Sequence, residues 1–546
     1  MFNRVDNQNL FNFHGRTKSL HENSEVLFDL IIIGGGITGA GICLDASSRG
    51  IKTLLIEKND FASGTSSKST KLIHGGLRYL KSLEFNLVRT VGQERSIAFK
   101  NAPHLIIPQK LILPIYQKGS FKKWQLRIAL TVYDFLARVQ KKEKKKILSS
   151  KATLEKEPSL KSTNLLGAGM YSEYRTDDSR LTLELIKTSL RFGALAFNYV
   201  EATDISKENN TFVVTAKNCI DNRFTTLRCK QLVNATGPWT DYLREINFRK
   251  SKKKICLSKG VHIVLKHKDL PLKNPVYFDA LERRMCFAIP RNNCTYVGTT
   301  DTIYTKSIKE NPRASKNDIQ YIIDSVNNHF NVPTISENNI ISSWTGLRPL
   351  IYQKNKKTKE LSRKDELIVD NNNMISIAGG KLTGYRIMAK KVTDLVCKNL
   401  SSNVKCKTHS IQLISSKNIN ESTIKKVKND YINEISKYGL LWGEAENLFH
   451  TYGSNLGDII ELYKLKKFKN FIEAEALYCI EKESTITLVD FFERRTSRIH
   501  YNPEKIYDQA KLILPIFSKY LKLSNHKEKH LLEELFLHQQ NLTHFK

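Results

Sequence analysis

A glycine-rich turn between an apolar run and an alanine-rich segment constrains the fold of this chain more than any other feature. Residues 28–41 read FDLIIIGGGITGAG, with Gly34, Gly36 and Gly39 at the spacing GxGxxG. The apolar run predicts a buried strand, and the segment after the glycines predicts a helix that ends near Arg49. Glycines at this spacing admit a tight bend, a pyrophosphate and close helix packing, while the helix N-terminus attracts phosphate.

A second strand and an acidic residue complete the pattern of a dinucleotide-binding unit. Residues 52–56 are predicted to form this strand, and Glu57 follows it about 20 residues after the glycines. A carboxylate at this place accepts hydrogen bonds from ribose hydroxyls, which favours FAD or NAD over NADP. The sequence therefore predicts an adenine dinucleotide as cofactor, and FAD and NAD both stay open at this point.

Length and composition limit the class of protein. A chain of 546 residues with 40% hydrophobic residues is expected to fold into two or three domains. No apolar run approaches the roughly 18 residues of a membrane-spanning helix. Residues 1–24 lack the apolar stretch of a secretory signal. We therefore expect a protein of the cytoplasm or of a membrane surface that faces it.

The cysteines and the net charge of +33 assign no ligand by themselves. The cysteines show no CxxC pair and no cysteine–histidine cluster, so we expect no metal site. The positive charge is spread through lysine runs such as 141–146 and 464–469, which a compositional bias toward Lys and Asn also produces. We expect no nucleic acid as a partner.

The segment after Glu57 separates the two cofactors. Residues 58–79 read KNDFASGTSSKSTKLIHGGLRY, a hydroxyl-rich loop where a nicotinamide-binding fold would continue into another helix. Residues 65–67 offer hydroxyl and backbone donors to a diphosphate, and His74 precedes two glycines that allow close approach to a flat ring. These features favour FAD.

Residues 64–80, GTSSKSTKLIHGGLRYL, resemble the FAD-dependent glycerol-3-phosphate dehydrogenases, respiratory flavoenzymes of the D-amino-acid-oxidase-like superfamily. The resemblance recurs in order and spacing from about residue 25 to about residue 515. The other matching segments are YRTDDSRL at 174–181, VNATGPW at 233–239, FAIP at 287–290, VGTTD at 297–301, GLRPL at 346–350, AGGKLTGYR at 378–386 and DFFERRT at 490–496. The compact length is similar to that of the bacterial branch of the family.

The resemblance and the order of predicted elements imply an α/β fold in three parts. These are a discontinuous Rossmann-like FAD-binding domain, an inserted antiparallel-sheet substrate domain and a C-terminal helical domain. The expected boundaries are an N-terminal tail at 1–24, the FAD-binding domain at 25–101, 166–254 and 341–405, the substrate or cap domain at 102–165 and 255–340, and the helical domain at 410–546.

The resemblance also implies which residues hold FAD. The turn at 235–237 resembles a second contact with the diphosphate. The helix expected after Gly380 directs its N-terminus at the pyrimidine side of the flavin, where negative charge gathers on reduction. The expected cofactor-binding residues are Gly34, Gly36, Thr38, Gly39, Glu57, Thr65, Ser66, Ser67, Lys71, His74, Gly75, Ala235, Thr236, Gly237, Trp239, Gly346, Gly380, Lys381, Leu382 and Thr383.

The activity that the resemblance implies is oxidation of sn-glycerol 3-phosphate to dihydroxyacetone phosphate by hydride transfer to flavin N5. Removal of the hydroxyl proton requires a base whose pKa lies near the working pH, which favours histidine. His74 is the first candidate, and His262, on a predicted strand over the ring, is the second. Arg348 and Lys381 complete the expected catalytic set.

The phosphate of this substrate requires cationic partners. Arginine suits phosphate best, because its planar fork binds two oxygens at once. Arg348 is the first candidate and Arg78 the second. The expected substrate-binding residues are Arg78, Tyr79, Arg291, Arg348, Lys381 and Thr383.

Family resemblance implies a membrane quinone as electron acceptor, and hence contact with an anionic bilayer surface without crossing it. Residues 121–146 are the expected docking helix, since Trp124, Ile128, Val132 and Phe135 fall at helical spacing between lysine clusters. A helix packed into the protein core shows the same stripe, so both interpretations stay open. The expected location is the inner face of the cell membrane, and the oligomeric state, with a homodimer as one alternative, stays open.

Three other functions remain alternatives. A glycerol-3-phosphate oxidase that passes electrons to oxygen shares most of these motifs. A flavoprotein oxidase of amines or amino acids shares the nucleotide fold but should lack the KLIHGGLRY block at 71–79. A basic binding protein without flavin would explain the charge and leave the glycine motif unexplained.

Overall fold

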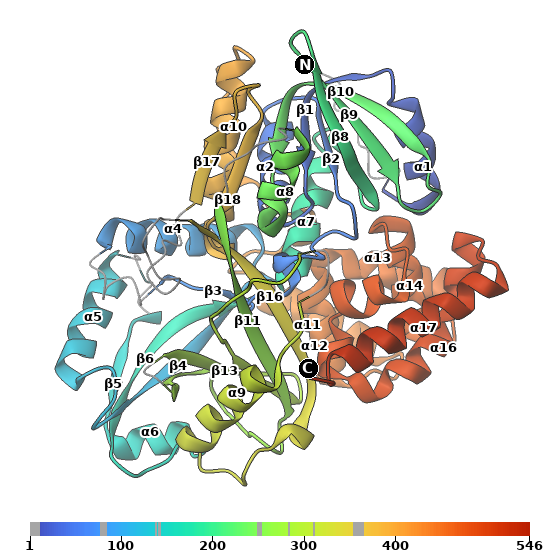
Figure 1. The fold of residues 1–546 in the computed structure, drawn as a ribbon. Coiled ribbons are helices and arrows are strands. Elements are labelled where there is room, and N and C mark those ends of the chain that lie inside the picture. Colours follow the sequence, from blue (N-terminus) through green and yellow to red (C-terminus); the bar gives the residue numbers. More distant parts are fainter. Residues whose placement is uncertain are drawn as a thin grey trace.

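Two sheets and a group of C-terminal helices make up the protein (Figure 1). The computed structural model describes residues 11–76, 84–136, 139, 143–247, 254–281, 284–308, 312–352 and 365–545. A mainly parallel sheet lies in the upper part of the view and a mainly antiparallel sheet in the lower part, with the C-terminal helices beside both.

The first sheet carries the glycine turn. Among the described residues it has eight strands, in the order β17-β18-β10-β1-β2-β7, with β9 and β8 continuing from β10. The strands are β1 (Leu27–Ile33), β2 (Thr53–Ile56), β7 (Leu195–Phe197), β8 (Val200–Glu208), β9 (Thr211–Asn218), β10 (Phe224–Asn234), β17 (Asp365–Val369) and β18 (Ile375–Gly379). Since β1 is parallel to β2 and β10, and β10 is parallel to β18, four carboxyl ends meet at one edge.

Strand β1 is apolar because both of its faces are buried. Leu30 and Ile32 belong to the core cluster under α2 (Ile37–Ser48), α7 (Asp178–Leu190) and α10 (Tyr385–Asn399). Ile31 and Ile33 belong to the cluster on the other face, with residues of β8, β9 and β10. The remaining helices of this part are α1 (Phe13–Glu22) and α8 (Thr240–Asn247).

The second sheet forms the opposite wall of the molecule's main pocket. In the described part of the chain it has ten strands, in the order β15-β11-β14-β13-β12-β4-β6-β3, with β16 paired to β11 and β5 to β6. The strands are β3 (Leu72–Ile73), β4 (Ile107–Tyr116), β5 (Lys146–Leu148), β6 (Leu165–Arg175), β11 (Ile255–Lys266), β12 (Val276–Asp279), β13 (Met285–Arg291), β14 (Cys294–Gly298), β15 (Thr302–Ile303) and β16 (Ile340–Ile351). The long pair of β11 and β16 sets His262 opposite Trp344.

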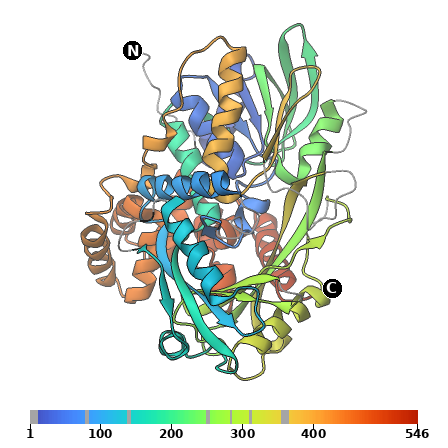
Figure 2. The ribbon, with the colours of Figure 1, turned by 90° about the vertical axis from the view of Figure 1, so that its left-hand side faces the viewer.

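Among the residues that the structure describes, four helices accompany this sheet: α4 (Phe85–Asn101), α5 (Lys123–Leu136), α6 (Ser150–Lys156) and α9 (Lys316–His329). Figure 2 shows α4 lying across the junction between the two sheets, with α5 next to it. Strands β6 and β16 both belong to the second sheet, where β6 pairs with β3, β4 and β5, and β16 pairs with β11. The expected boundaries place almost all of both strands in the FAD-binding domain. The domain boundaries themselves stay a prediction.

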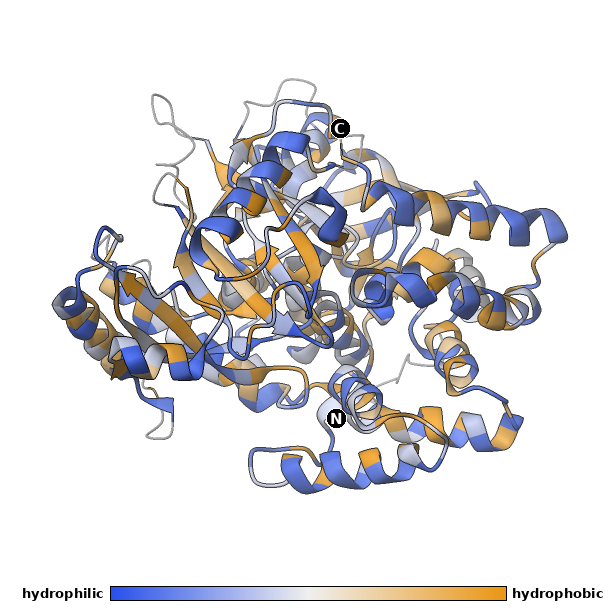
Figure 3. Cartoon of the chain, turned by 90° about the horizontal axis from the view of Figure 1, so that it is seen from below, coloured by the Kyte–Doolittle hydropathy of each residue, from blue (hydrophilic) through white to orange (hydrophobic). Residues whose placement is uncertain are grey.

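The C-terminal helices have a hydrophobic core of their own. They are α11 (Ile424–Ser436), α12 (Trp442–Tyr452), α13 (Leu456–Lys466), α14 (Phe471–Lys482), α15 (Arg498–Tyr501), α16 (Ile506–Leu521) and α17 (Asn525–Asn541). Hydrophilic and hydrophobic residues alternate along them, as expected of helices with one packed side (Figure 3). Among the described helices, none combines the length and apolar character required to span a bilayer.

A buried ion-pair cluster ties the C-terminal helices to the first sheet. Asp60, just after β2, accepts hydrogen bonds from Arg494 Nε at 2.6 Å and from Arg495 at 2.6 and 2.9 Å. All three residues are buried. Removing one partner from such a cluster leaves uncompensated charge away from water.

We therefore expect Asp60→Ala to lower the free energy of unfolding by about 3–5 kcal/mol. Denaturant unfolding of the purified protein measures this loss. The matched control is Glu533→Ala on α17, whose ion pair with Lys529 is exposed and is expected to contribute less than about 1 kcal/mol. Equal effects of the two substitutions would contradict the role assigned to the cluster.

Candidate functional site

A large pocket lies where the carboxyl ends of β1, β2, β10 and β18 face β11 and β16 of the second sheet. Its volume is about 570 Å³. In open parallel sheets the carboxyl edge of the strands is the usual ligand site, and small-molecule pockets are of about this size.

The glycine turn forms one end of the pocket. Gly34 has a φ of +112°, and a Cβ there would lie 2.6 Å from the carbonyl oxygen of Ala235. A Cβ on Gly39 would lie 1.9 Å from the carbonyl oxygen of Gly34. Glycine is therefore required at both positions, and α2 starts directly at the pocket with its N-terminus toward the cavity.

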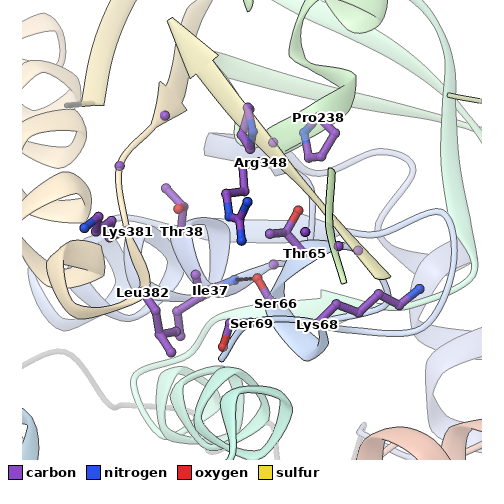
Figure 4. Close-up of a pocket in the computed structure, with 18 of the residues that line it drawn as sticks. Ile37, Thr38, Thr65, Ser66, Lys68, Ser69, Pro238, Arg348, Lys381 and Leu382 are labelled. Atoms are coloured by element: carbon purple, nitrogen blue, oxygen red, sulfur yellow. Dashed lines mark hydrogen bonds between the residues drawn. The ribbon is translucent and has the colours of Figure 1, made fainter. Parts of the chain in front are cut away.

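The segment between β2 and β3 is hydrogen-bonded to this turn at two points. The Ser66 hydroxyl accepts a hydrogen bond from the Ile37 N–H at 2.9 Å, as Figure 4 shows. The Glu57 carboxylate accepts hydrogen bonds from the N–H groups of Gly35 and Asn59, at 2.8 and 2.9 Å. Burial raises the pKa of Glu57, although these two N–H groups act in the opposite direction.

Two further strand ends border the pocket. The segment 235–239 follows β10, and the segment 380–383 follows β18 and leads into α10. Gly380 has a φ of +76°, and a Cβ there would lie 2.2 Å from Met388 Sδ. The backbone therefore turns tightly over α10 before Lys381.

Arg348 comes from β16 on the opposite wall. Its guanidinium donates hydrogen bonds to Thr299 Oγ1 at 2.8 Å, to the Thr300 carbonyl at 3.1 Å and to Asp301 Oδ1 at 3.3 Å. A Cβ on Gly260 of β11 would lie 2.3 Å from this guanidinium, so the glycine makes room for it. Figure 4 shows the Arg348 side chain in the part of the pocket that Thr38 and Thr65 also line.

His262 lies on β11 beside Arg348 and is 1% exposed. Its Nε2 is 3.0 Å from Thr70 Oγ1, and its ring stacks on Trp344 with centroids 5.0 Å apart. Burial, followed by the charges of Arg348 and Lys71, lowers the pKa of His262 well below 6.5. Burial and the neighbouring cations thus favour the neutral imidazole and oppose its protonation.

His74 lies at the junction of the two sheets and lines the pocket. Its N–H donates to Thr383 Oγ1 at 3.2 Å, and the Thr383 hydroxyl lies 3.3 Å from the His74 carbonyl oxygen. The loop of His74 is therefore held directly against the turn that follows β18.

The structure brings together most of the residues expected from the sequence. Arg78 and Tyr79 lie outside the described residues. The expected residues that line the pocket are Gly34, Gly36, Thr38, Glu57, Thr65, Ser66, His74, Ala235, Thr236, Gly237, Trp239, His262, Gly346, Arg348, Gly380, Lys381, Leu382 and Thr383.

Five expected residues, Gly39, Ser67, Lys71, Gly75 and Arg291, are not among the residues that line the pocket. Lys71 is buried and binds Asp178 at 2.6 Å, and Arg291 binds Asp177 at 2.9 Å. Each of these two cations is therefore paired with a carboxylate within the fold. Gly39 and Gly75 instead allow close packing.

Other pocket residues were not expected from the sequence. Thr299, Thr300 and Asp301 fall in a segment that matches the family, so that signal was available. Lys68 and Phe287 also fall in matching segments, at 64–80 and 287–290. Other unexpected residues lie outside these segments and include Phe121, Tyr171, Glu173, Tyr277, Arg284 and Met285.

The residues at the strand ends fit an adenine dinucleotide. Side chains are missing where a diphosphate would approach the backbone, at Gly34 and Gly36. Glu57 lines the pocket just after β2, where a carboxylate can accept hydrogen bonds from ribose hydroxyls. The family model described as FAD dependent oxidoreductase matches residues 29–386, and that of the C-terminal domain of alpha-glycerophosphate oxidase matches residues 406–528. Fold and site thus define an FAD-dependent oxidoreductase.

Relatives of known name specify the kind of FAD-dependent oxidoreductase. The aerobic glycerol-3-phosphate dehydrogenase of Bacillus subtilis (strain 168) is 44% identical over 505 residues, covering 89% of this chain and 90% of the relative. That of Staphylococcus aureus (strain MRSA252) is 41% identical over 517 residues, covering 91% of each.

Solved structures agree with this result. The glycerol-3-phosphate dehydrogenase from Bacillus halodurans, complexed with FAD, has a TM-score of 0.84 and 36% identity, covering 98% of this chain and 99% of that chain. The L-alpha-glycerophosphate oxidase from Mycoplasma pneumoniae shares the fold, with a TM-score of 0.56 and 18% identity, covering 70% and 96%. The chain belongs to the family of FAD-dependent glycerol-3-phosphate dehydrogenases, and its cofactor is FAD.

We expect Glu57→Ala to weaken FAD binding by about 10- to 100-fold, because the carboxylate holds the glycine turn and is placed to accept hydrogen bonds from the ribose hydroxyls. Titration of the apoprotein with FAD, followed by fluorescence, measures the change. Glu208→Ala at the exposed end of β8 is the matched control and should leave the affinity unaltered. Equal affinities for the Glu57→Ala variant and the control would contradict this assignment.

Proposed function

We propose that this protein oxidises sn-glycerol 3-phosphate to dihydroxyacetone phosphate with its bound FAD and passes the electrons to a membrane quinone. The observation that carries the proposal is that Arg348, His74 and His262 line one pocket with the strand ends that fit the dinucleotide. The names of the relatives at 41–44% identity support the substrate.

Arg348 is the proposed phosphate-binding residue. Its guanidinium is fixed from behind by Thr299, Thr300 and Asp301, so it is already oriented when the substrate arrives. Lys381 lines the same pocket and adds a second cation. A preorganised guanidinium holds an anionic substrate without the entropic cost of ordering its long side chain.

Bound FAD accepts the two electrons and the hydrogen of the substrate carbon. The protein must remove the hydroxyl proton, and a neutral imidazole in the pocket does this best near physiological pH. We propose His74 as this base and keep His262 as the second candidate. Either histidine must lie near the hydroxyl while Arg348 holds the phosphate.

We expect replacement of the base by Asn to slow flavin reduction by about 10²- to 10⁴-fold, and replacement of the other histidine by less than 10-fold. Anaerobic mixing of the His74→Asn and His262→Asn variants with glycerol 3-phosphate, followed at the flavin absorbance, measures both rates. Wild-type protein should bleach under the same conditions.

The pH dependence of kcat/KM, which reports on the free enzyme, tests whether His262 is the base. Because its pKa is lowered, the proton-accepting form persists below pH 6.5 and is lost only when the pH falls through the lowered value. If His262 is the base, kcat/KM should fall only well below pH 6.5. A yellow protein that glycerol 3-phosphate fails to bleach would contradict the proposed substrate, and unchanged rates in both variants would contradict both bases.

Helix α5 supports the membrane part of the proposal. Trp124, Ile128 and Phe135 are 61, 56 and 81% exposed, whereas Leu126 and Tyr133 are buried. The helix therefore packs one apolar face into the protein and turns a second one outward. Figure 1 shows α5 at the edge of the molecule.

The surroundings of this outer face favour an anionic bilayer as its occupant. Lys122, Lys123, Arg127, Lys144 and Lys146 are all exposed. Near an anionic surface each such cation contributes about 1 kcal/mol, and exposed aromatic residues insert at the interface.

The wall of the pocket next to α5 favours a quinone as the electron acceptor. Phe121, Tyr171, Tyr277, Met285 and Phe287 line it, and the rings of Tyr277 and Phe287 stack with centroids 4.2 Å apart. Such a wall suits an apolar aromatic acceptor.

We expect the double substitution Trp124→Asp/Phe135→Asp to abolish binding to vesicles that contain phosphatidylglycerol, since two charges would then face the bilayer. Co-flotation measures binding. The matched control is Leu441→Asp/Trp442→Asp on the C-terminal helices, where both residues are also exposed. Reduction of a soluble acceptor should stay unchanged in both variants. Retained flotation of the α5 variant, or equal loss in the control, would contradict the docking surface.

A further inference from the structure

A buried polar cluster lies behind the loop of His74. It consists of Arg95 on α4, Tyr133 on α5 and Glu173 on β6, and each of the three side chains is almost fully buried. Glu173 also lines the pocket. These residues are far apart in the sequence and none belongs to the motifs that identify the site.

Glu173 connects the cluster to the active-site backbone. Its Oε2 accepts hydrogen bonds from the Gly75 N–H at 2.9 Å and from Arg95 at 3.2 Å, and its Oε1 accepts from the Tyr133 hydroxyl at 3.0 Å. Arg95 also donates to the Tyr133 oxygen at 2.8 Å and to the Ser172 carbonyl at 2.7 Å. Both carboxylate oxygens are therefore engaged, one of them by the peptide group directly after His74.

Tyr133 contacts the same peptide. A Cβ on Gly75 would lie 2.0 Å from the Tyr133 hydroxyl oxygen. The hydroxyl therefore occupies the place of a side chain at residue 75 and leaves the loop no room to move toward α5.

The other side of the loop is held by Thr383, whose hydroxyl lies within 3.2 and 3.3 Å of the N–H and carbonyl groups of His74. The pair His74–Gly75 is thus fixed between the cluster and the turn after β18. Burial raises the pKa of Glu173, opposed first by the charge of Arg95 and then by its hydrogen bonds. A buried, charged cluster of this kind is a poor source of stability but defines one geometry.

We propose that Tyr133, Glu173 and Arg95 are positioning residues for the active-site loop, which they hold so that the His74 imidazole meets the substrate hydroxyl. The inference rests on the proposed function. A displacement of a reacting group by about 1 Å can cost about 10²-fold in rate. Loss of one hydrogen bond in the cluster should therefore slow the chemical step without weakening substrate binding.

The test uses the FAD-loaded protein and two conservative variants, Tyr133→Phe and Glu173→Gln. Each removes hydrogen bonds and keeps the shape of the side chain. Anaerobic stopped-flow mixing with glycerol 3-phosphate gives the rate constant of flavin reduction and the apparent substrate Kd. We expect a rate loss on the order of 10-fold for each variant, with Kd changed less than about 2-fold.

Two matched controls come from the same part of the fold. Tyr116→Phe removes a hydroxyl that donates to the Lys161 carbonyl at 2.9 Å, and Glu157→Gln replaces a buried carboxylate that accepts from the N–H groups of Lys273 and Asn274. Neither Tyr116 nor Glu157 lines the pocket. Both controls should reduce flavin at the wild-type rate, whatever they do to thermal stability.

A double-mutant cycle with His74→Asn distinguishes positioning from a merely structural role. If the cluster acts through His74, adding Tyr133→Phe to His74→Asn should cause no further loss. Three results would each overturn the proposal. The first is additive losses in the double variant, the second is a wild-type rate in His74→Asn, and the third is wild-type rates in both Tyr133→Phe and Glu173→Gln. Failure of the proposed function is seen separately, because wild-type protein itself would then not be reduced by glycerol 3-phosphate.

Discussion

The contact of Gly39 with the carbonyl oxygen of Gly34 is the constraint on which the site depends. With 1.9 Å left for a Cβ, only glycine lets α2 approach the end of β1 so closely. The turn between them then presents N–H groups to Glu57 and Ser66, which both belong to the segment between β2 and β3. One packing requirement thus places the glycine turn and this segment side by side at the pocket.

The strand, turn and helix at the glycine motif could be predicted from the sequence, because neighbouring residues determine them. The run of residues 28–33 and the glycines after it specify strand, turn and helix, because both the burial and the bend are properties of neighbouring residues. Arg348 was found through a family segment and His262 through a predicted strand, and both line the pocket. The α/β fold with two sheets and C-terminal helices is confirmed.

Long-range partners were not predictable in the same way. Arg291 and Lys71 look like substrate or cofactor cations in the sequence, but each binds a carboxylate more than 100 residues away in the chain, at Asp177 and Asp178. Glu173 has no motif around it and still reaches the loop of His74. For helix α5, the sequence showed apolar residues at helical spacing, with Trp124 among them. It did not show which of the two apolar faces of the helix packs inward.

The strand order also has a consequence for biosynthesis. Strand β1 lies between β2, which follows it at once, and β10, which ends at residue 234. At about 5–20 residues per second, a ribosome needs roughly 10–40 s to make the roughly 200 residues that separate them. Throughout that time one edge of this apolar strand has no native neighbour, and an unpaired apolar edge attracts other chains. During this period the nascent protein therefore depends on other segments or a chaperone to shield that edge.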